Sequence, residues 1–505
     1  MSFSRPALEA DRRRITFVVP PVTAEDRYGP MASAGNSLPP HAFLYLGAVA
    51  RDIGWAVSIV DGPAYGLGLD GCADAILETD PEVVGFTTTT MSIAKAARVA
   101  ERLRAKRPEL LIMVGGPHIT ALPVETLERL EVFDLGCVGE GEGLVIDTLR
   151  CLERGDDPRG IAGMVYRDDE RVVHNNPPPC EEIELADLPP LAWDLLDDFP
   201  ARYHAAATYL NKTPFSDIIV SRGCRYKCTF CDNQTFGRSI RALPVDRILE
   251  NIDRLVGDYG IKSMFFTDDS LMTLRSDFEE VCEGLIERNY DLEWSINART
   301  SEIDEEILAL MKRAGCWQIS YGVESGSWEI LKRIKKAATP RMQAKALHLT
   351  AAAGIKSNAY IIIGFPGETH ETLKETEDFL KTVPIDTLRL TYFTPFPNTD
   401  ITGDLEGNGE IVADWTKLNF YNIAYIPTGL TRKDLERAYR RIMLHFYTRP
   451  RVLKSFLPHL LVPRKAAALF RGTFGLGKLL VTGPGKPTTG AAGGPAGSAG
   501  GECHA

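Results

Sequence analysis

The order of apolar segments in the first 155 residues limits the fold of this chain more than any other feature. Five short apolar runs alternate with segments of helical periodicity. The predicted strands are 15–19, 56–61, 83–87, 110–116 and 134–139, and the predicted helices are 41–52, 70–78, 91–106, 123–131 and 142–154. Five consecutive strand–helix units predict a parallel, doubly wound sheet covered by helices on both faces.

A parallel sheet of this kind binds ligands beyond the carboxyl ends of its strands. Here those ends carry small residues and hydroxyl groups, among them Thr88, Gly115, Gly116 and the sequence Gly139-Glu140-Gly141-Glu142. Such residues let a large flat ligand approach the backbone. Glycine pairs at strand ends are also ordinary tight turns, so a flavodoxin-like or Rossmann-like domain with another ligand, or with none, stays an alternative.

A second series of strand–helix units follows between residues 206 and 400. Its six predicted strands are 218–223, 262–270, 292–299, 316–327, 357–369 and 388–399. Polar residues or glycines stand at their carboxyl ends, including Asp268, Asp269, Asn297, Arg299, Glu324 and Gly364. This pattern predicts a partial (β/α)6 barrel whose functional face gathers those ends.

Three cysteines, Cys224, Cys228 and Cys231, follow the first strand of this second series in the spacing C-x3-C-x2-C. Thiolates are the soft ligands of iron–sulfur clusters and zinc, and a closed site of either kind normally has four ligands. The next cysteines, Cys180 and Cys282, lie some forty to fifty residues away, so three thiolates would leave one position open. A structural zinc with a distant ligand, or buried cysteines without a metal, are the alternatives.

With Phe230 directly before its last cysteine, the motif resembles the signature of the radical SAM superfamily. The resemblance implies a [4Fe–4S] cluster on the three cysteines. This cluster would bind S-adenosylmethionine (SAM) and cleave it to a 5′-deoxyadenosyl radical. We therefore treat the cysteines as both metal ligands and catalytic residues.

The same resemblance implies which other residues contact SAM. Phe230 and the backbone around Ile363 and Gly364 are expected beside the adenine, and Glu324 is expected at the ribose or methionine. Asp268 or Asp269 is expected to meet the amino group. Each carboxylate alone could instead cap a helix.

Residues 14–155 resemble the cobalamin-binding domain that precedes the core in class B radical SAM enzymes. The matching motifs are N-x2-LPP at 36–40, GGPH at 115–118 and GEGE at 139–142. We therefore expect Thr88, Gly115, Gly116 and His118 beside cobalamin. The motif D-x-H-x-x-G is absent and the loop after the first strand has no histidine. We therefore expect no protein histidine beneath the cobalt, and His118 and His41 are better explained as residues that cap loops.

Composition limits the partners and the compartment. A net charge of −11 argues against nucleic acid. Neither a signal peptide nor an apolar run of about eighteen residues occurs. Ten scattered cysteines suit a reducing compartment. These features predict a cytoplasmic protein.

We expect the following organisation along the chain: an extension at 1–13, the cobalamin-type domain at 14–155, a hairpin and linker at 156–205, the radical SAM core at 206–400, a helical extension at 401–481 and a disordered tail at 482–505. Residues 452–481 are apolar with interspersed basic residues. They fit a helix packed on the barrel or a peripheral contact with a membrane surface.

Together these features predict a cobalamin-dependent radical SAM methyltransferase. Its substrate would be an unactivated carbon of a small or lipid-like molecule, because a carbon without a lone pair must first lose a hydrogen atom. An external electron donor such as flavodoxin or ferredoxin would be required. The alternatives are oxidation or ring closure, as in anaerobic porphyrin-ester cyclases, and a non-catalytic corrinoid- or zinc-binding protein.

Overall fold

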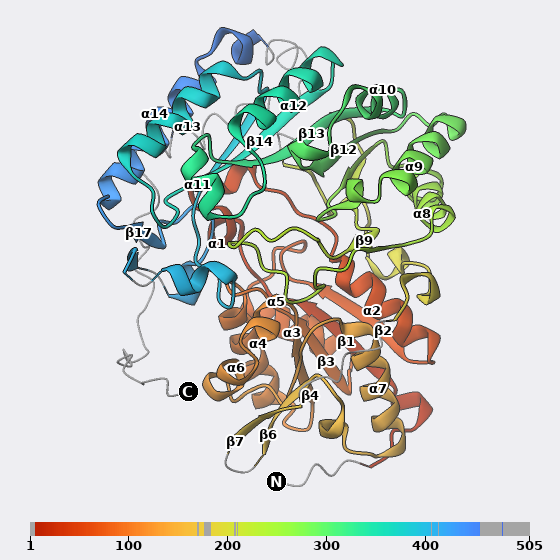
Figure 1. Cartoon of the computed structure of the whole chain (residues 1–505). Helices are drawn as coiled ribbons and strands as arrows, with labels where there is room; N and C mark the ends of the chain where they lie inside the picture. Colours follow the sequence, from red (N-terminus) through yellow and green to blue (C-terminus); the bar gives the residue numbers. More distant parts are fainter. Residues whose placement is uncertain are drawn as a thin grey trace.

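The computed structural model describes residues 6–168, 171–175, 183–206, 209, 211–405, 407–412, 414–454 and 477. The chain forms two α/β halves stacked on each other (Figure 1). The N-terminal half is red to orange in that view, and the C-terminal half, green to blue, lies above it.

The N-terminal half contains a seven-stranded sheet in the order β2-β1-β3-β4-β5-β6-β7. Its parallel strands are β1 (Arg14–Val19), β2 (Ala56–Asp61), β3 (Val83–Thr87), β4 (Leu111–Gly115) and β5 (Leu135–Cys137). This order confirms the predicted doubly wound, flavodoxin-like domain. The predicted hairpin, β6 (Met164–Asp168) and β7 (Arg171–His174), pairs antiparallel with β5. It therefore extends the sheet of the first half instead of forming part of a separate connector.

Helices cover both faces of this sheet because successive strand residues point to opposite sides. Phe17 of β1 packs in one core with α2 (His41–Asp52) and α7 (Gly141–Arg154). Val18 packs in the other core with α3 (Leu69–Glu78) and α4 (Ile93–Lys106). Three short helices lie in the loops: α1 (Ala24–Tyr28), α5 (Pro117–Ala121) and α6 (Pro123–Arg129).

The C-terminal half is built on a six-stranded parallel sheet in the order β15-β14-β13-β12-β11-β8. The strands are β8 (Phe215–Ile218), β11 (Ser263–Phe266), β12 (Glu293–Ala298), β13 (Cys316–Glu324), β14 (Lys356–Ile363) and β15 (Thr387–Tyr392). The helices are α8 (Val245–Gly257), α9 (Arg275–Arg288), α10 (Glu305–Arg313), α11 (Trp328–Arg333), α12 (Pro340–Ala352) and α13 (His370–Thr382). This arrangement confirms the partial barrel.

The first strand of the barrel begins earlier than the sequence predicted. The apolar residues Ile219 and Val220 already lie beyond β8, and the next two residues form β9 (Ser221–Arg222). This short strand pairs antiparallel with β10 (Arg241–Ala242). The chain therefore turns out of the barrel before it reaches the cysteines.

The C-terminal extension packs on the last barrel strand. It contains β16 (Gly409–Ile411), β17 (Tyr425–Pro427) and α14 (Arg432–Tyr447), and Tyr439 of α14 stacks on Tyr392 with 5.1 Å between ring centroids. The interpretations of 452–481 and of the tail fall almost entirely outside the described residues. In the part of the chain that the structure describes, no helix is long and apolar enough to cross a membrane.

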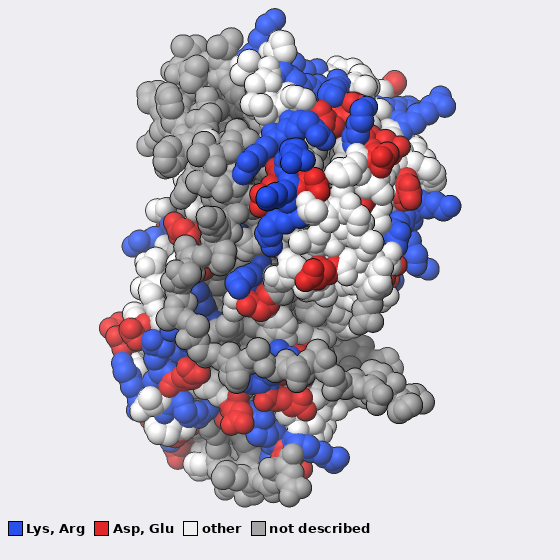
Figure 2. Space-filling model, turned by 90° about the vertical axis from the view of Figure 1, so that its left-hand side faces the viewer, with Lys and Arg blue, Asp and Glu red and all other residues white. Residues whose placement is uncertain are grey.

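Charged side chains of both signs appear on the face shown in Figure 2, and Lys and Arg are more numerous over its upper part.

Candidate functional site

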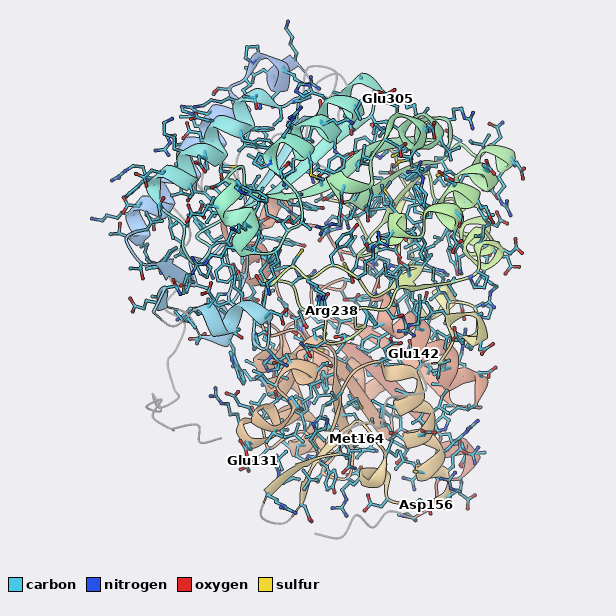
Figure 3. The ribbon with its side chains drawn as sticks, viewed as in Figure 1. Glu131, Glu142, Asp156, Met164, Arg238 and Glu305 are labelled. Carbon is cyan, nitrogen blue, oxygen red and sulfur yellow. The ribbon has the colours of Figure 1, made fainter. Side chains whose placement is uncertain are left out.

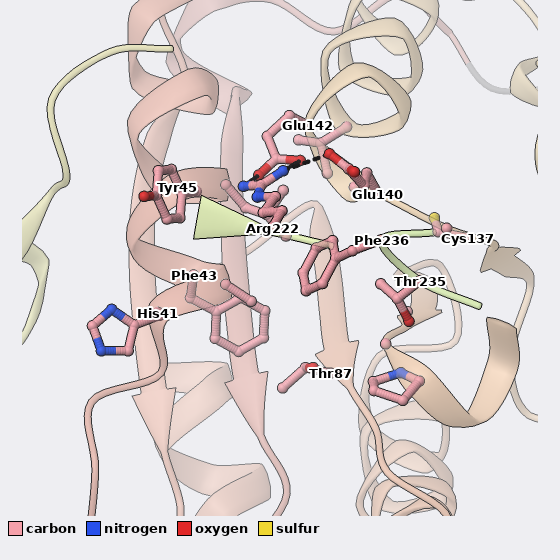
Figure 4. Close-up of a pocket in the computed structure, with 18 of the residues that line it drawn as sticks. His41, Phe43, Tyr45, Thr87, Cys137, Glu140, Glu142, Arg222, Thr235 and Phe236 are labelled. Atoms are coloured by element: carbon pink, nitrogen blue, oxygen red, sulfur yellow. Dashed lines mark hydrogen bonds and ion pairs between the residues drawn. The ribbon is translucent and has the colours of Figure 1, made fainter. Parts of the chain in front are cut away.

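A pocket of about 490 Å³ lies between the two halves of the molecule. From the N-terminal half it is lined by apolar core residues such as Phe17 and Phe43 and by the strand-end glycines Gly115 and Gly116. From the C-terminal half it is lined by Ile219, Arg222, Gly223, Asp232, Asn233, Thr235, Phe236, Gly237 and Asp269. The pocket therefore runs from the core of one domain to the cysteine loop of the other (Figure 4).

Local backbone conformation keeps the rim of this pocket free of side chains. Gly116 has a φ of +97°, a region that favours glycine. A Cβ atom added there would lie 2.8 Å from the backbone nitrogen and oxygen of Thr88. Only glycine allows β4 to pass this closely to the end of β3, which explains the predicted Gly115-Gly116 motif.

Arg222 joins the two halves at the wall of the pocket. Its guanidinium donates to Glu140 and to Glu142, each at 2.6 Å, and the side chains of Arg222 and Glu142 are both 7% exposed. The ring of Tyr45 packs on one side, with the guanidinium carbon 4.9 Å from its centroid, and Phe236 on the other, at 5.3 Å. Figure 4 shows these groups converging, and Figure 3 places Glu142 at the boundary between the halves.

The electrostatics of Arg222 follow from this burial. Burial opposes the charge of the guanidinium, but Glu142 and Glu140 outweigh this effect and raise the pKa of Arg222. Glu140 also pairs with Arg241. The motif GEGE therefore supplies a carboxylate pair that holds the segment directly before the first cysteine.

The cysteine loop begins at Gly223, whose φ is +85°. A Cβ atom there would stand 1.9 Å from the carbonyl oxygen of Ser239, so the loop can close on itself only with glycine. In the described part of the chain, no three His, Cys, Asp or Glu side chains form a group with metal-ligating geometry. The thiols of Cys224 and Cys228 nevertheless lie close enough to that of Cys231 to affect its pKa.

Cys231 shows this neighbourhood most clearly. The residue is open to solvent, yet the protein that surrounds its thiol, followed by Asp269 and the other two cysteines, raises its pKa to about 12. The structure thus brings together the three cysteines and one of the two candidate aspartates.

Asp268 and Asp269 have different surroundings. Oδ1 of Asp268 is buried and accepts hydrogen bonds from the backbone N–H groups of Val220 (2.9 Å) and Ser221 (2.6 Å) and from the hydroxyl of Ser221 (2.6 Å). Burial raises the pKa of Asp268 to about 6. Asp269 is exposed and lines the pocket. Asp268 therefore holds the chain ahead of the cysteine loop, and Asp269 is the carboxylate that a ligand can reach.

Glu324 lies at the end of β13 with a φ of +64°. Its carboxylate accepts a hydrogen bond of 2.8 Å from the buried Lys336. The backbone oxygen of Lys336 in turn accepts from Arg299, and the same guanidinium donates to the sulfur of Cys228 at 3.5 Å. Arg299 also lies over the ring of Tyr226, 3.7 Å from its centroid. A continuous polar chain thus connects the predicted SAM carboxylate to a predicted cluster ligand.

Some backbone groups of the predicted adenine site already form hydrogen bonds within the protein. The N–H groups of Gly364 and Phe365 donate to Glu368 at 2.7 and 3.3 Å, and the carbonyl of Ile363 accepts from Phe393. Phe230 packs edge-on against Phe365 with 5.4 Å between ring centroids. The structure therefore brings Phe230 to the predicted adenine segment, and contact of either with SAM stays a prediction.

Thr88 and His118, two expected cobalamin contacts, both have partners within the protein, and their contact with cobalamin stays a prediction. The hydroxyl of Thr88 donates to the carbonyl of Gly115 at 3.0 Å. His118 is buried, Nδ1 lies 3.2 Å from the hydroxyl of Thr90, and its ring lies edge-on to Trp415. Burial lowers the pKa of His118 to about 4. Both side chains thus form contacts within the protein, at the loop that follows β3 and at the start of α5.

His41 does line the pocket, but its Nε2 faces Asp217 at 3.1 Å. The prediction that no histidine binds the cobalt remains a prediction.

Sequence reasoning missed three basic residues of this site, Arg222, Arg299 and Lys336. Arg222 stands two residues before the first cysteine, and Arg299 ends a predicted strand. Their partners lie between 12 and 82 residues away. The buried acidic pair in GEGE was the available indication, since buried carboxylates require cations.

The fold and the site define a class of protein in which a cobalamin-type domain faces a radical SAM core across a shared pocket. Comparison with known families agrees. Residues 29–147 match the B12 binding domain and residues 218–380 match the Radical SAM superfamily, which together account for more than half of the chain. The chain therefore belongs to the radical SAM enzymes that carry a B12 binding domain, and the expected cofactors agree with both families.

Relatives with known sequences and structures cover most of the chain. An uncharacterized methyltransferase of Pyrococcus horikoshii is 29% identical over 88% of this chain and 95% of its own length. An anaerobic magnesium-protoporphyrin IX monomethyl ester cyclase of Rubrivivax gelatinosus is 28% identical over 80% of this chain and 72% of its own. The solved structure of the cobalamin-dependent S-adenosylmethionine radical enzyme OxsB superposes with a TM-score of 0.71 at 20% identity, over 94% of this chain and 74% of that chain.

Proposed function

We propose that this protein is a cobalamin-dependent radical SAM methyltransferase that acts on an unactivated carbon of a small or lipid-like substrate. The observation that carries the proposal is the pocket shared by the two halves. It begins among core residues of the B12 binding domain and ends at Asp232 and Asp269, beside the cysteine loop. Two cofactors bound at its ends would lie next to each other, as transfer of a methyl group to a substrate radical requires.

The residues present fit these cofactors. The glycine rim at Gly115 and Gly116 opens onto a slot lined by apolar side chains such as Phe17 and Phe43, which suits a large and flat ligand with an extended tail. The three neighbouring thiols suit an iron–sulfur cluster. When bound, the cluster and SAM supply a radical that removes a hydrogen atom, and cobalamin supplies the methyl group.

The side chains of the protein would bind SAM and hold the cysteine loop in position. Asp269 offers an exposed carboxylate for the ammonium group of SAM. The chain from Glu324 through Lys336 to Arg299 fixes the position of Cys228. Arg222 fixes the cysteine loop against the B12 binding domain. Since one electron must reach the cluster from outside, we also propose an external donor such as flavodoxin or ferredoxin, in the cytoplasm.

A second candidate is oxidation or ring closure, favoured by the similarity to the magnesium-protoporphyrin ester cyclase. A reaction with SAM labelled with deuterium in its methyl group separates the two. Methyl transfer releases S-adenosylhomocysteine and 5′-deoxyadenosine in comparable amounts and adds the labelled methyl group to the product. A product without the label, formed with 5′-deoxyadenosine but little S-adenosylhomocysteine, overturns the methyltransferase proposal.

A further inference from the structure

The inner face of the barrel sheet carries polar residues that remain partly open to solvent. Outward-facing residues such as Ile361 and Leu390 are 1% exposed or less, because helices cover them. Tyr360 and Arg389, by contrast, point to the opposite side and are partly exposed. They are register partners on neighbouring strands, so their side chains lie next to each other on the same face.

Among the residues that the structure describes, Arg389 is a half-buried arginine without a polar partner, as is Arg440 of α14. Within the described residues, its guanidinium has no hydrogen bond and no ion pair, whereas the buried Arg222 and Arg299 are each bound to several acceptors. Its recorded contact is with the ring of Tyr360, 5.8 Å from the guanidinium carbon. A half-buried guanidinium without an anionic partner is costly, since its five donors lose water without gaining acceptors.

The surroundings of Arg389 are aromatic hydroxyl groups. The ring of Tyr360 lies beside the guanidinium, and the hydroxyl of Tyr360 is hydrogen-bonded to that of Tyr209. Tyr421 and Tyr28 lie within electrostatic range of Arg389. The four tyrosines come from the barrel, the connector, the C-terminal extension and the N-terminal half. Arg389 therefore lies near residues from four separate segments of the chain.

These tyrosines are held in place by their own contacts. The hydroxyl of Tyr360 donates to the side-chain oxygen of Asn297 at 3.2 Å and pairs with the hydroxyl of Tyr209. The amide of Asn358 donates to Tyr209 at 3.2 Å. The rings of Tyr28 and Tyr421 lie edge to face, 6.3 Å apart. The frame around the guanidinium is thus ordered before a ligand binds.

The depth of the site suits a substrate that reacts at the carboxyl edge of the sheet. Tyr360, the partner of Arg389 in register, stands three residues before Ile363, the last residue of β14. At about 3.3 Å per residue, this places the guanidinium roughly 10 Å below the edge where the cysteine loop and Glu324 lie. A molecule anchored there by one end would present its other end to that edge.

We propose that Arg389 binds the carboxylate or phosphate group of the substrate, so that the substrate is a small organic anion. The planar donors of the guanidinium match a pair of oxygens of either group. This assignment rests on the proposed function, because it takes the bound anion to be the molecule that reacts.

The test measures binding to the anaerobically reconstituted holoenzyme, not turnover. Benzoate and phenylphosphonate serve as probes, benzyl alcohol as their neutral counterpart, and calorimetry at constant ionic strength as the readout. Arg389→Met is expected to weaken the binding of both anions at least about tenfold, because they lose their charge-assisted hydrogen bonds, and to leave the binding of benzyl alcohol unchanged. The control is Arg437→Met, because Arg437 is an exposed arginine on α14.

The assignment is overturned if neither anion binds the wild type, or if both bind Arg389→Met as tightly as they bind the wild type. It is also overturned if inorganic phosphate binds as tightly as phenylphosphonate, because this would indicate a site for free phosphate. Should Arg389→Met not fold, Arg389→Lys keeps the charge and loses the planar donors, and an intermediate affinity is expected. Because no product is formed, failure here is distinct from failure of the methyl-label experiment.

Discussion

Replacement of Arg222 by methionine tests whether the ion pairs at the wall of the pocket hold the two halves together. In Arg222→Met, Glu140 keeps its partner Arg241, but Glu142 loses both of its bonds to the guanidinium. Since the Glu142 side chain is 7% exposed, the variant leaves a buried carboxylate without a charged partner. Removing one partner of a buried pair costs about 3–5 kcal/mol, and we expect that loss in the free energy of unfolding.

Anaerobic urea unfolding, followed by tryptophan fluorescence, measures this loss. The control is Arg51→Met, which breaks the exposed pair of Arg51 with Asp194 and should cost only about 0.5 kcal/mol. The double variant Glu142→Gln/Arg222→Met should recover at least about 2 kcal/mol, because the stranded charge is gone. The reasoning is refuted if Arg222→Met and Arg51→Met lose the same stability, or if the double variant recovers nothing.

Two further predictions concern the cluster and a buried acid. Cys224→Ala, Cys228→Ala and Cys231→Ala should each lose the roughly four irons and the broad visible absorption of the reconstituted protein and form no 5′-deoxyadenosine; stoichiometric zinc without sulfide in the wild type would contradict this. Burial raises the pKa of Glu368 to about 7 from 4.5. The folded state therefore binds this proton more tightly than the unfolded state, and stability should fall by up to about 3 kcal/mol as the pH rises from 4.5 through 7. Glu368→Gln, measured by urea unfolding across this range, should flatten that decline, and an unchanged slope would exclude Glu368 as its source.

Much of the fold follows from the sequence because most strands of both sheets are largely buried and therefore apolar. Their apolar runs gave bounds that match β1, β2 and β3 within a residue, and α2 exactly as it is found. The start of the barrel could not be placed in this way. Ile219 and Val220 look like strand residues, but the backbone of Val220 is bound by Asp268, which lies 48 residues further along the chain.

Residues of the candidate site could be predicted from the sequence where they belong to a local motif. Contacts between residues that are distant in the sequence could not. The cysteines, Gly116 and Asp269 belong to local motifs at strand ends, and the structure brings them to one pocket or beside it. The ion-pair partners of Arg222 and the aromatic neighbour of Arg389 come from other segments of the chain, so no local pattern indicates them. His118 shows the same limit, because a glycine–proline turn does not reveal which way the following side chain points, and its contact with cobalamin stays a prediction.

The shared pocket also has a consequence for the order in which the protein is made. The residues that line it from the C-terminal half, between Ile219 and Asp269, follow the end of the B12 binding domain at 147 by about 70 to 120 positions. At about 5 to 20 residues per second, the ribosome needs roughly 5 to 25 seconds to add them. Until those residues are in place, the C-terminal wall of the pocket is missing. A ligand loaded in this interval would be enclosed by the completed chain, and its later exchange would require the two halves to separate.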